Sequence, residues 1–334
     1  MQTFEYSRPT TIDQAVQSGA RSKTAQQYAD VRFVAGGTTL VDLMKLDVER
    51  PKQLVDINGL PLDQIQSAPG GGLIIGALAR NAAVAHHPTV QRDYPVLSEA
   101  LLSGASPQLR NMATTAGNLL QRTRCVYFRD TAHACNKREP GTGCSAIGGH
   151  NRMLAILGTS KDCIATNPSD QNVALTALEA TIQVQGTKGK RTIPIGEFYV
   201  KPGSTPHRET VLEPGDLIVG VTLPPLEPGT RSHYLKLRDR AAYEFALTSA
   251  AVVVSVRGGK IERARVALGG VGTVPWRSHE AEHALQGQTA NAATFHKAAE
   301  AALKDAQPAS ENGFKVELAK RCIVRALTVT TQTA

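Results

Sequence analysis

Four of the five cysteines in this 334-residue chain fall in one stretch, and their thiols are the side chains best suited to bind a metal. Long, irregular intervals separate them, in a segment with few apolar runs that would form a core of its own: Cys125, Cys135, Cys144 and Cys163. Thiolates are soft ligands, which both zinc and iron–sulfur clusters prefer. Zinc sites usually hold their ligands in closely spaced pairs such as C-x2-C, and the sequence has no such pair. The spacing favours an iron–sulfur cluster and keeps zinc as the alternative.

The charge of the cysteine segment also favours the cluster. Residues 121–163 contain seven Lys or Arg and three Asp or Glu, and the net charge of +4 would offset the negative charge of a thiolate-bound cluster. Cys322 lies on the apolar stripe of an expected C-terminal helix, where a buried structural thiol is the better interpretation. The basic side chains are interpreted as charges around the site or on the surface, and no catalytic residue is assigned: Arg122, Arg124, Arg129, Lys137 and Arg138.

Two turns of small residues offer donors for a nucleotide. In Phe33–Leu40 (FVAGGTTL) a strand leads into two glycines and two threonines, an arrangement that can bind a pyrophosphate through backbone amides and a helix N-terminus. An ordinary strand–helix turn is the alternative. Thr114–Asn118 (TTAGN) offers similar donors or is only a capping turn. Together the two turns favour FAD, whereas no G-x-G-x-x-G follows a strand to support a Rossmann nicotinamide domain.

Three further residues have a candidate role at a flavin nucleotide. Asp170 can accept a hydrogen bond from a ribose hydroxyl, although an N-cap of the following helix explains it equally well. Lys236 and Arg238, on an expected strand, can place positive charge near the flavin ring, or are simply exposed charges.

The elements that position these residues form a mixed pattern of helices and strands. Before the cysteine segment we expect strands over Val31–Ala35, Gln53–Ile57 and Leu73–Ala77, and helices over Thr11–Ala20, Leu40–Leu46, Ala82–His86 and Pro95–Leu102. At Pro107–Met112 we expect a short turn or helix. After it we expect a helix over Val173–Leu178, capped by Asp170, and strands over Thr181–Gln185 and Leu217–Leu223. Pro224–Gly229 is the clearest linker.

Beyond the linker the pattern changes to a meander. We expect strands over His233–Leu237, Ala250–Arg257 and Arg263–Leu268, with Arg257–Lys260 as a hairpin turn, and helices over Ala293–Ala306 and Glu311–Thr328. The whole is expected to be an α+β protein with its domain break at Pro224–Gly229.

Composition excludes several classes of protein. The net charge is +8, but only 4% of residues are aromatic and no basic run is interleaved with aromatics, so nucleic-acid binding is not supported. No apolar run reaches the length of a membrane span. The first residues lack a basic and then apolar signal segment, so we expect a soluble chain without an export signal of its own.

The motifs resemble those of the FAD-binding subunit of the xanthine dehydrogenase/molybdenum hydroxylase family over essentially the full length. Phe33–Leu40 matches the first flavin loop, comprising Phe33, Val34, Ala35, Gly36, Gly37, Thr38, Thr39 and Leu40. Thr114–Asn118 matches the second, comprising Thr114, Thr115, Ala116, Gly117 and Asn118. By the same resemblance Asp170 is the ribose-binding acid, and Ile218 and Lys236 are contacts on the isoalloxazine side.

The segment between Asn118 and Asp170 is longer than in most members of that family. Its four cysteines are similar to those of the [4Fe–4S]-bearing subgroup, most of all the flavin subunits of bacterial periplasmic aldehyde oxidoreductases. The resemblance implies an FAD-binding domain of the vanillyl-alcohol-oxidase (PCMH) type over residues 1–223, with subdomains 1–58 and 59–223 and a cluster insert over 121–166. A smaller α+β domain is then expected over 230–334.

The resemblance also implies a function. The chain would be the FAD and [4Fe–4S] subunit of a heterotrimer, taking electrons from a [2Fe–2S] subunit that serves a molybdenum-cofactor subunit, and passing them to an external acceptor. It would be exported to the periplasm as a passenger of a partner's twin-arginine signal, with a cytoplasmic location as the alternative. Two other functions stay open: a stand-alone FAD oxidoreductase and a zinc-stabilised binding module.

Overall fold

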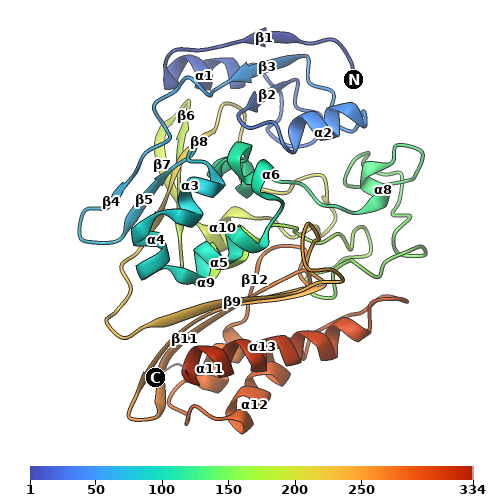
Figure 1. Cartoon of the computed structure of the whole chain (residues 1–334). Helices are drawn as coiled ribbons and strands as arrows, with labels where there is room; N and C mark the ends of the chain where they lie inside the picture. The colour runs from blue at the N-terminus through green and yellow to red at the C-terminus, as the bar shows by residue number, and fades with distance from the viewer. Residues whose placement is uncertain (333–334) are drawn as a thin grey trace.

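The computed structural model describes residues 1–332, which form three sheets with helices packed around them (Figure 1). The first sheet is parallel, in the order β1-β3-β2, with β1 at Glu5–Ser7, β2 at Val31–Val34 and β3 at Gln53–Asp56. Helix α1 (Ile12–Gly19) packs Ala15 and Val16 against it, and helix α2 (Leu40–Lys45) follows β2 directly. The expected strands and helices of residues 1–58 are therefore present, and β1 is an edge strand that the sequence pattern did not indicate.

The second sheet has five strands in the order β4-β5-β8-β6-β7. Every neighbouring pair in it is antiparallel, and the core lies where helices α3 to α5 and α9 cover it. The strands are β4 (Ile65–Ser67), β5 (Leu73–Gly76), β6 (Thr181–Gly186), β7 (Gly189–Pro194) and β8 (Leu217–Leu223). The helices are α3 (Asn81–His86), α4 (Pro88–Asp93), α5 (Pro95–Ser103), α6 (Pro107–Met112), α7 (Thr115–Leu119), α9 (Asp170–Ala177) and α10 (Ile195–Phe198).

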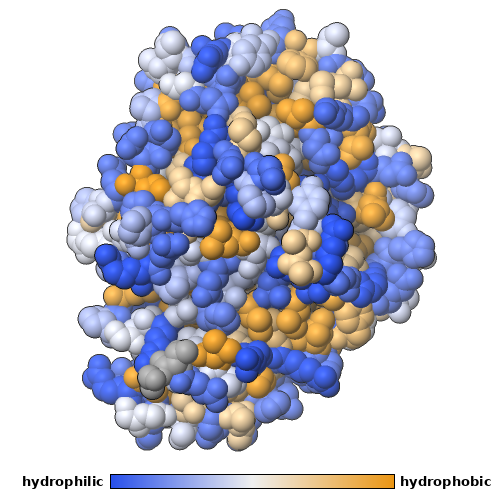
Figure 2. All heavy atoms as spheres, in the orientation of Figure 1, coloured by the Kyte–Doolittle hydropathy of each residue, from blue (hydrophilic) through white to orange (hydrophobic). Residues whose placement is uncertain are grey.

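The third sheet is the expected meander, in the order β12-β11-β10-β9. Gly258 and Gly259, both with positive φ, make the hairpin turn between β10 and β11. Helices α11 to α13 cover one face of this sheet, and Figure 2 shows hydrophobic residues gathered between the sheet and α13. The elements are β9 (Arg231–Leu237), β10 (Thr248–Arg257), β11 (Lys260–Gly269), β12 (Trp276–Arg277), α11 (His279–Leu285), α12 (Ala292–Leu303) and α13 (Phe314–Gln332). Cys322 is fully buried in this core, as expected.

The cysteine segment is mostly irregular, with one short helix, α8 (Val126–Arg129). Contrary to the expectation that it lacks a core, the segment forms a small one around Phe128 and Leu154, which Leu43 and Val48 of the N-terminal region complete. Its far end is tied to the C-terminal region. There Lys315 Nζ donates hydrogen bonds to the carbonyls of Leu154 (3.0 Å) and Gly270 (2.8 Å). The insert is thus held between two regions that are distant in the sequence.

Candidate functional site

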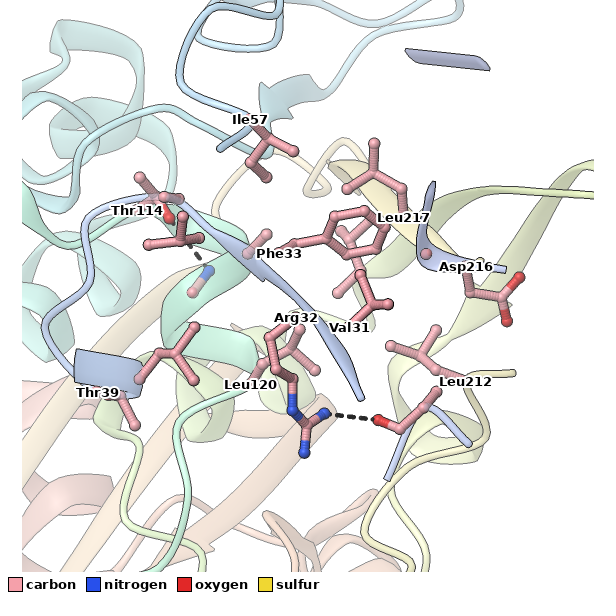
Figure 3. Close-up of a pocket in the computed structure, with 18 of the residues that line it drawn as sticks. Val31, Arg32, Phe33, Thr39, Ile57, Thr114, Leu120, Leu212, Asp216 and Leu217 are labelled. Atoms are coloured by element: carbon pink, nitrogen blue, oxygen red, sulfur yellow. Dashed lines mark hydrogen bonds between the residues drawn. The ribbon is translucent and has the colours of Figure 1, made fainter. Parts of the chain in front are cut away.

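The first glycine turn opens onto a cavity between the first two sheets. We call it the loop cavity; its walls are largely apolar and include Val31, Phe33, Ile57, Leu78, Leu120, Leu212, Leu217 and Ile218. Figure 3 shows Phe33 beside Leu217, while Arg32 points to the other side and donates to the carbonyl of Ala25 (2.9 Å). Because side chains alternate along β2, neighbouring residues supply an apolar wall and a cation. The cavity can therefore take a flat apolar group with polar edges.

The turn itself presents free backbone donors. Within residues 1–332, none of the backbone amides of Gly36, Gly37, Thr38 and Thr39 donates to a backbone carbonyl, and α2 begins directly after them. Gly37 has φ +71°, and a Cβ at Gly36 would clash with the carbonyl of Met112. Two glycines are needed because one residue is left-handed and the other touches the neighbouring backbone. Adjacent free amides of this kind form a site for an anion such as a pyrophosphate.

The second turn is a helix cap rather than an amide cradle. The hydroxyl of Thr114 accepts from Gly117 N (3.2 Å), and the amides of Thr115 and Ala116 donate to Ala79 and Ala77. The amides that were expected to be free donors are therefore already hydrogen-bonded within the protein. Thr114, Ala116 and Gly117 nevertheless line the loop cavity, so the turn shapes it without supplying most of its donors.

A second cavity contains the candidate ribose acid, and we call it the Asp170 cavity. It shares Thr38, Thr39 and Gly117 with the loop cavity, so one extended ligand can occupy both and pass the glycine turn between them. Asp170 was expected to cap helix α9, but it is the first residue of the helix. Ser169 is the cap, and its hydroxyl accepts from Asn172 N (3.1 Å). The cap fell one residue earlier because a serine hydroxyl serves this role equally well.

The carboxylate of Asp170 is held by two side chains of β9. Tyr234 donates its hydroxyl proton to Oδ1 (2.5 Å), and Lys236 Nζ donates to Oδ2 (2.8 Å) and to the carbonyl of Ser103 (3.1 Å). Burial, and then the Asp170 charge, raise the pKa of Tyr234 well above its ordinary value, so this hydroxyl stays a donor. Arg238 also binds the Ser103 carbonyl (2.8 Å) instead of lying free. Tyr234 carried no motif that would have identified it.

The two contacts predicted on the isoalloxazine side do not lie together. Ile218 lines the loop cavity, whereas Lys236 lines the Asp170 cavity and pairs with the candidate ribose acid. Their separation could not be predicted from the sequence, because strands β8 and β9 belong to different sheets. A planar ring in either cavity therefore contacts one of these two residues.

All four clustered cysteines line one small enclosed space, the cysteine cavity. Cys125, Cys135 and Cys163 are buried, Cys144 is half-buried, and none is in a disulfide. Cys135 and Cys144 face each other across an isolated antiparallel bridge, and Ala165 N donates to Cys163 Sγ (3.5 Å). Burial raises the pKa of the Cys125 thiol to about 12 and raises the pKa of Cys163. The fold thus brings together four thiols that are up to 38 positions apart in the sequence.

Within the described residues 1–332, no three His, Cys, Asp or Glu side chains are grouped closely enough to hold one metal ion. Two thiolates on one zinc stand no more than about 4.6 Å apart, given a Zn–S distance of about 2.3 Å. The four cysteines line a common space, but no three of them are grouped closely enough for one ion. Their arrangement does not form a ready single-ion site.

A row of buried and half-buried charges, missed in the sequence, connects the cysteine cavity to the loop cavity. Glu209 accepts from Arg122 and from Lys137 Nζ (3.0 Å), and Arg122 also binds Glu49 (2.5 Å). Burial opposes the ionisation of Glu209, but Arg122 and then Lys137 lower its pKa to about 2. Arg122 and Lys137 were expected at the surface or around the site; their side chains are each only 10% exposed.

Residues 1–332 include no helix that is both long and apolar enough to cross a membrane.

Comparison with known sequences covers nearly the whole chain. A family model described as the FAD binding domain in molybdopterin dehydrogenase matches residues 2–226, and one described as the CO dehydrogenase flavoprotein C-terminal domain matches 233–330. The chain is 50% identical over 329 residues to the aldehyde oxidoreductase FAD-binding subunit PaoB of Escherichia coli K12, covering 98% of each. It is 31% identical over 281 residues to the 6-hydroxypseudooxynicotine dehydrogenase complex subunit alpha of Paenarthrobacter nicotinovorans, covering 84% of this chain and 78% of that one.

Solved structures give the same picture. A chain of the carbon monoxide dehydrogenase of Hydrogenophaga pseudoflava superposes with a TM-score of 0.76 at 27% identity, covering 98% of this chain and 97% of that one. Quinoline 2-oxidoreductase of Pseudomonas putida 86 gives a TM-score of 0.75 at 25% identity, covering 99% and 98%. The predicted α+β fold, an FAD-binding domain followed by a smaller C-terminal domain, is confirmed.

Proposed function

This chain belongs to the family of FAD-binding flavoprotein subunits of molybdopterin dehydrogenases and is an oxidoreductase subunit, and from that premise we propose that it carries FAD and a [4Fe–4S] cluster in an aldehyde-oxidising molybdenum hydroxylase complex. The single observation that carries the proposal is the placement of four thiols around one cavity, next to a glycine turn with free amides. The four thiols would hold the cluster, and the glycine turn would hold the pyrophosphate of the flavin.

FAD fits the two connected cavities. Its pyrophosphate suits the free amides of Gly36–Thr39, at the turn that the two cavities share. The isoalloxazine and the adenosine would lie on opposite sides of that turn, one in the loop cavity with Ile218 and the other in the Asp170 cavity with Lys236. Bound FAD supplies the group through which electrons from a partner leave to an external acceptor.

The chemistry of the donor set supports a cluster over zinc. The four thiolates of a [4Fe–4S] cluster bind four different irons, so they surround a common space at wider spacing than the ligands of one zinc ion. Lys137 lines the same cavity and adds positive charge beside Cys163. A cation there favours the thiolate form that an iron ligand needs. A zinc-stabilised binding module is correspondingly less well supported by this geometry.

The partners follow from the relatives. The PaoB relative is a subunit of an aldehyde oxidoreductase, and we propose that this chain likewise assembles with a molybdenum-cofactor subunit and a [2Fe–2S] subunit. Substrate oxidation would take place on the molybdenum partner. We also propose that the chain reaches the periplasm as a passenger of a partner's signal.

Affinity purification from the native host tests the assignment. We expect two co-purifying subunits, one FAD per chain, molybdenum and iron in the complex, and loss of aldehyde-dependent dye reduction when this chain is deleted. Activity of the isolated chain on aldehydes, with stoichiometric FAD and no partners, would instead support the stand-alone oxidoreductase. Fractionation of the host, with the complex found in the cytoplasm, would contradict the proposed export.

A further inference from the structure

Helix α2, which follows the first glycine turn directly, packs against the cysteine segment. Leu43 of α2 is buried and belongs to the small core of that segment, together with Cys125 and Phe128. The same leucine lines the loop cavity, one of the two cavities proposed for FAD. One side chain of α2 is therefore shared by the cysteine segment and the flavin site.

Two arginines of the cysteine segment bind one carboxylate of the same helix. Asp42 Oδ2 accepts from Arg129 Nη2 (2.8 Å) and from Arg124 Nη1 (3.2 Å). Arg124 directly precedes Cys125 in the chain, and the backbone amide of Arg129 donates to the carbonyl of Cys125 (3.2 Å). The position of α2 is therefore tied to the backbone on both sides of a proposed cluster ligand.

A further connection lies just beyond the end of α2. Val48 is buried in the same small core, and Glu49 accepts from Arg122 Nη1 (2.5 Å). On the other side of the first glycine turn lies β2, which pairs with β3. The turn is therefore held at its first end by the N-terminal sheet and at its second end, through α2, by the cysteine segment.

We propose that the cysteine segment holds the first glycine turn in place through α2, so that a cluster on the four thiols raises the affinity of the chain for FAD. This inference rests on the proposed function, in which the turn holds the pyrophosphate and the thiols hold the cluster. It applies to either direction of the flavin, because the pyrophosphate lies at the turn in both. Loss of the cluster loosens the segment, and with it Arg124, Arg129 and the core around Leu43. A turn that is then ordered for about one tenth of the time raises the apparent Kd for FAD about tenfold.

Titration of FAD into the flavin-depleted complex, purified anaerobically, measures this coupling. Cys144→Ser is the most informative variant, because Cys144 lines the cysteine cavity and neither of the cavities proposed for FAD. We expect this variant to lose iron and to raise the Kd for FAD about tenfold. Cys322→Ser is the matched control, since it changes a buried cysteine of another core and should alter neither quantity. Loss of iron from Cys144→Ser with an unchanged Kd would overturn the proposal.

Asp42→Ala tests the connection without changing a thiol. Asp42 lies in the first turn of α2, so its negative charge opposes the binding of an anion at the glycine turn, and its loss would strengthen FAD binding if charge alone mattered. The proposal predicts the opposite sign, a Kd raised up to about fivefold, as for the loss of a partly exposed ion pair. Arg321→Gln breaks an exposed ion pair of α13 and should leave the Kd unchanged. A stronger or unchanged affinity in Asp42→Ala would refute the connection through α2.

The outcomes separate this inference from the proposed function. If Cys144→Ser does not assemble, removal of iron from the wild-type complex with a chelator, followed by the same titration, decides the effect of the cluster. Absence of FAD or of iron from the wild-type complex would contradict the proposed function and, with it, this inference. A wild-type complex that contains both, with the Kd for FAD unchanged in Cys144→Ser and in Asp42→Ala, would refute the inference alone.

Discussion

Replacing Gly37 by alanine should weaken FAD binding while leaving the fold in place. Gly37 has φ +71°, a left-handed conformation that costs an L-residue about 1–2 kcal/mol. A Cβ at this position would lie 3.1 Å from Val41 Cγ2, which is tight but touches only a side chain. The turn holds the free amides of Gly36–Thr39 in their places only while this conformation is kept. Since about 1.4 kcal/mol is a factor of ten, the Kd for FAD should rise roughly five- to thirtyfold.

Gly258→Ala is the matched control for that prediction. Gly258 has φ +56° in the hairpin turn between β10 and β11, with nothing within 4 Å of the added Cβ. The backbone cost is therefore similar, but Gly258 lines neither of the two cavities proposed for FAD. Gly37→Asn should recover part of the loss, because asparagine tolerates the left-handed region better than alanine.

The assay is titration of FAD into protein from which the flavin has been removed, followed by quenching of flavin fluorescence. Thermal unfolding of the flavin-free variants shows whether each keeps its fold. We expect weaker FAD binding only for Gly37→Ala, because its turn relaxes without the flavin and must return to the left-handed conformation on binding, whereas the turn of Gly258 meets no ligand. Equal FAD affinities in the two variants would refute the role of the first loop as the pyrophosphate site.

Two further predictions concern the insert. Serine in place of any one of the four clustered cysteines should lower the iron content of the purified complex. Cys322→Ser should not lower it, because Cys322 is buried in the separate core of the third sheet. Equal iron loss in all five variants would contradict the assignment. Burial lowers the pKa of Lys315 to about 7. The unfolded chain keeps that proton to a higher pH, so this group adds up to about 1.4 kcal/mol of stability per unit as the pH rises from about 7 to about 10. Lys315→Met should remove that part of the slope, which urea unfolding at about pH 7 and about pH 9 measures; an unchanged slope would show that Lys315 has an ordinary pKa.

The sequence predicted the positions of most elements because their apolar periodicity is strong. The meander strands, the α13 stripe with Cys322 and the strand–turn–helix around Gly36 and Gly37 all follow from local pattern. Short elements with weak periodicity, such as β1 and β7, were not predicted, since their pairing depends on strands far away in the chain.

The contents of the site were predicted better than its geometry. The four cysteines and the first loop are recognisable from residue types. The backbone amides of the first turn are free and those of the second are hydrogen-bonded, a difference that depends on their tertiary partners. Arg122 and Glu209 are 87 positions apart and carry no motif, so only the folded chain brings them together. Tyr234 was missed for the same reason. It lies in β9 of the third sheet, whereas its partner Asp170 lies in helix α9, which covers the second sheet.

Determination of iron, acid-labile sulfide, zinc and FAD in the wild-type chain, purified anaerobically, tests the central claim most directly. The proposed function predicts four irons and four sulfides for each FAD, with no zinc. It also predicts a paramagnetic signal, on reduction, that is lost in Cys135→Ser. One FAD with neither iron nor sulfide, or one zinc in place of iron, would contradict the assignment of the four cysteines to a cluster.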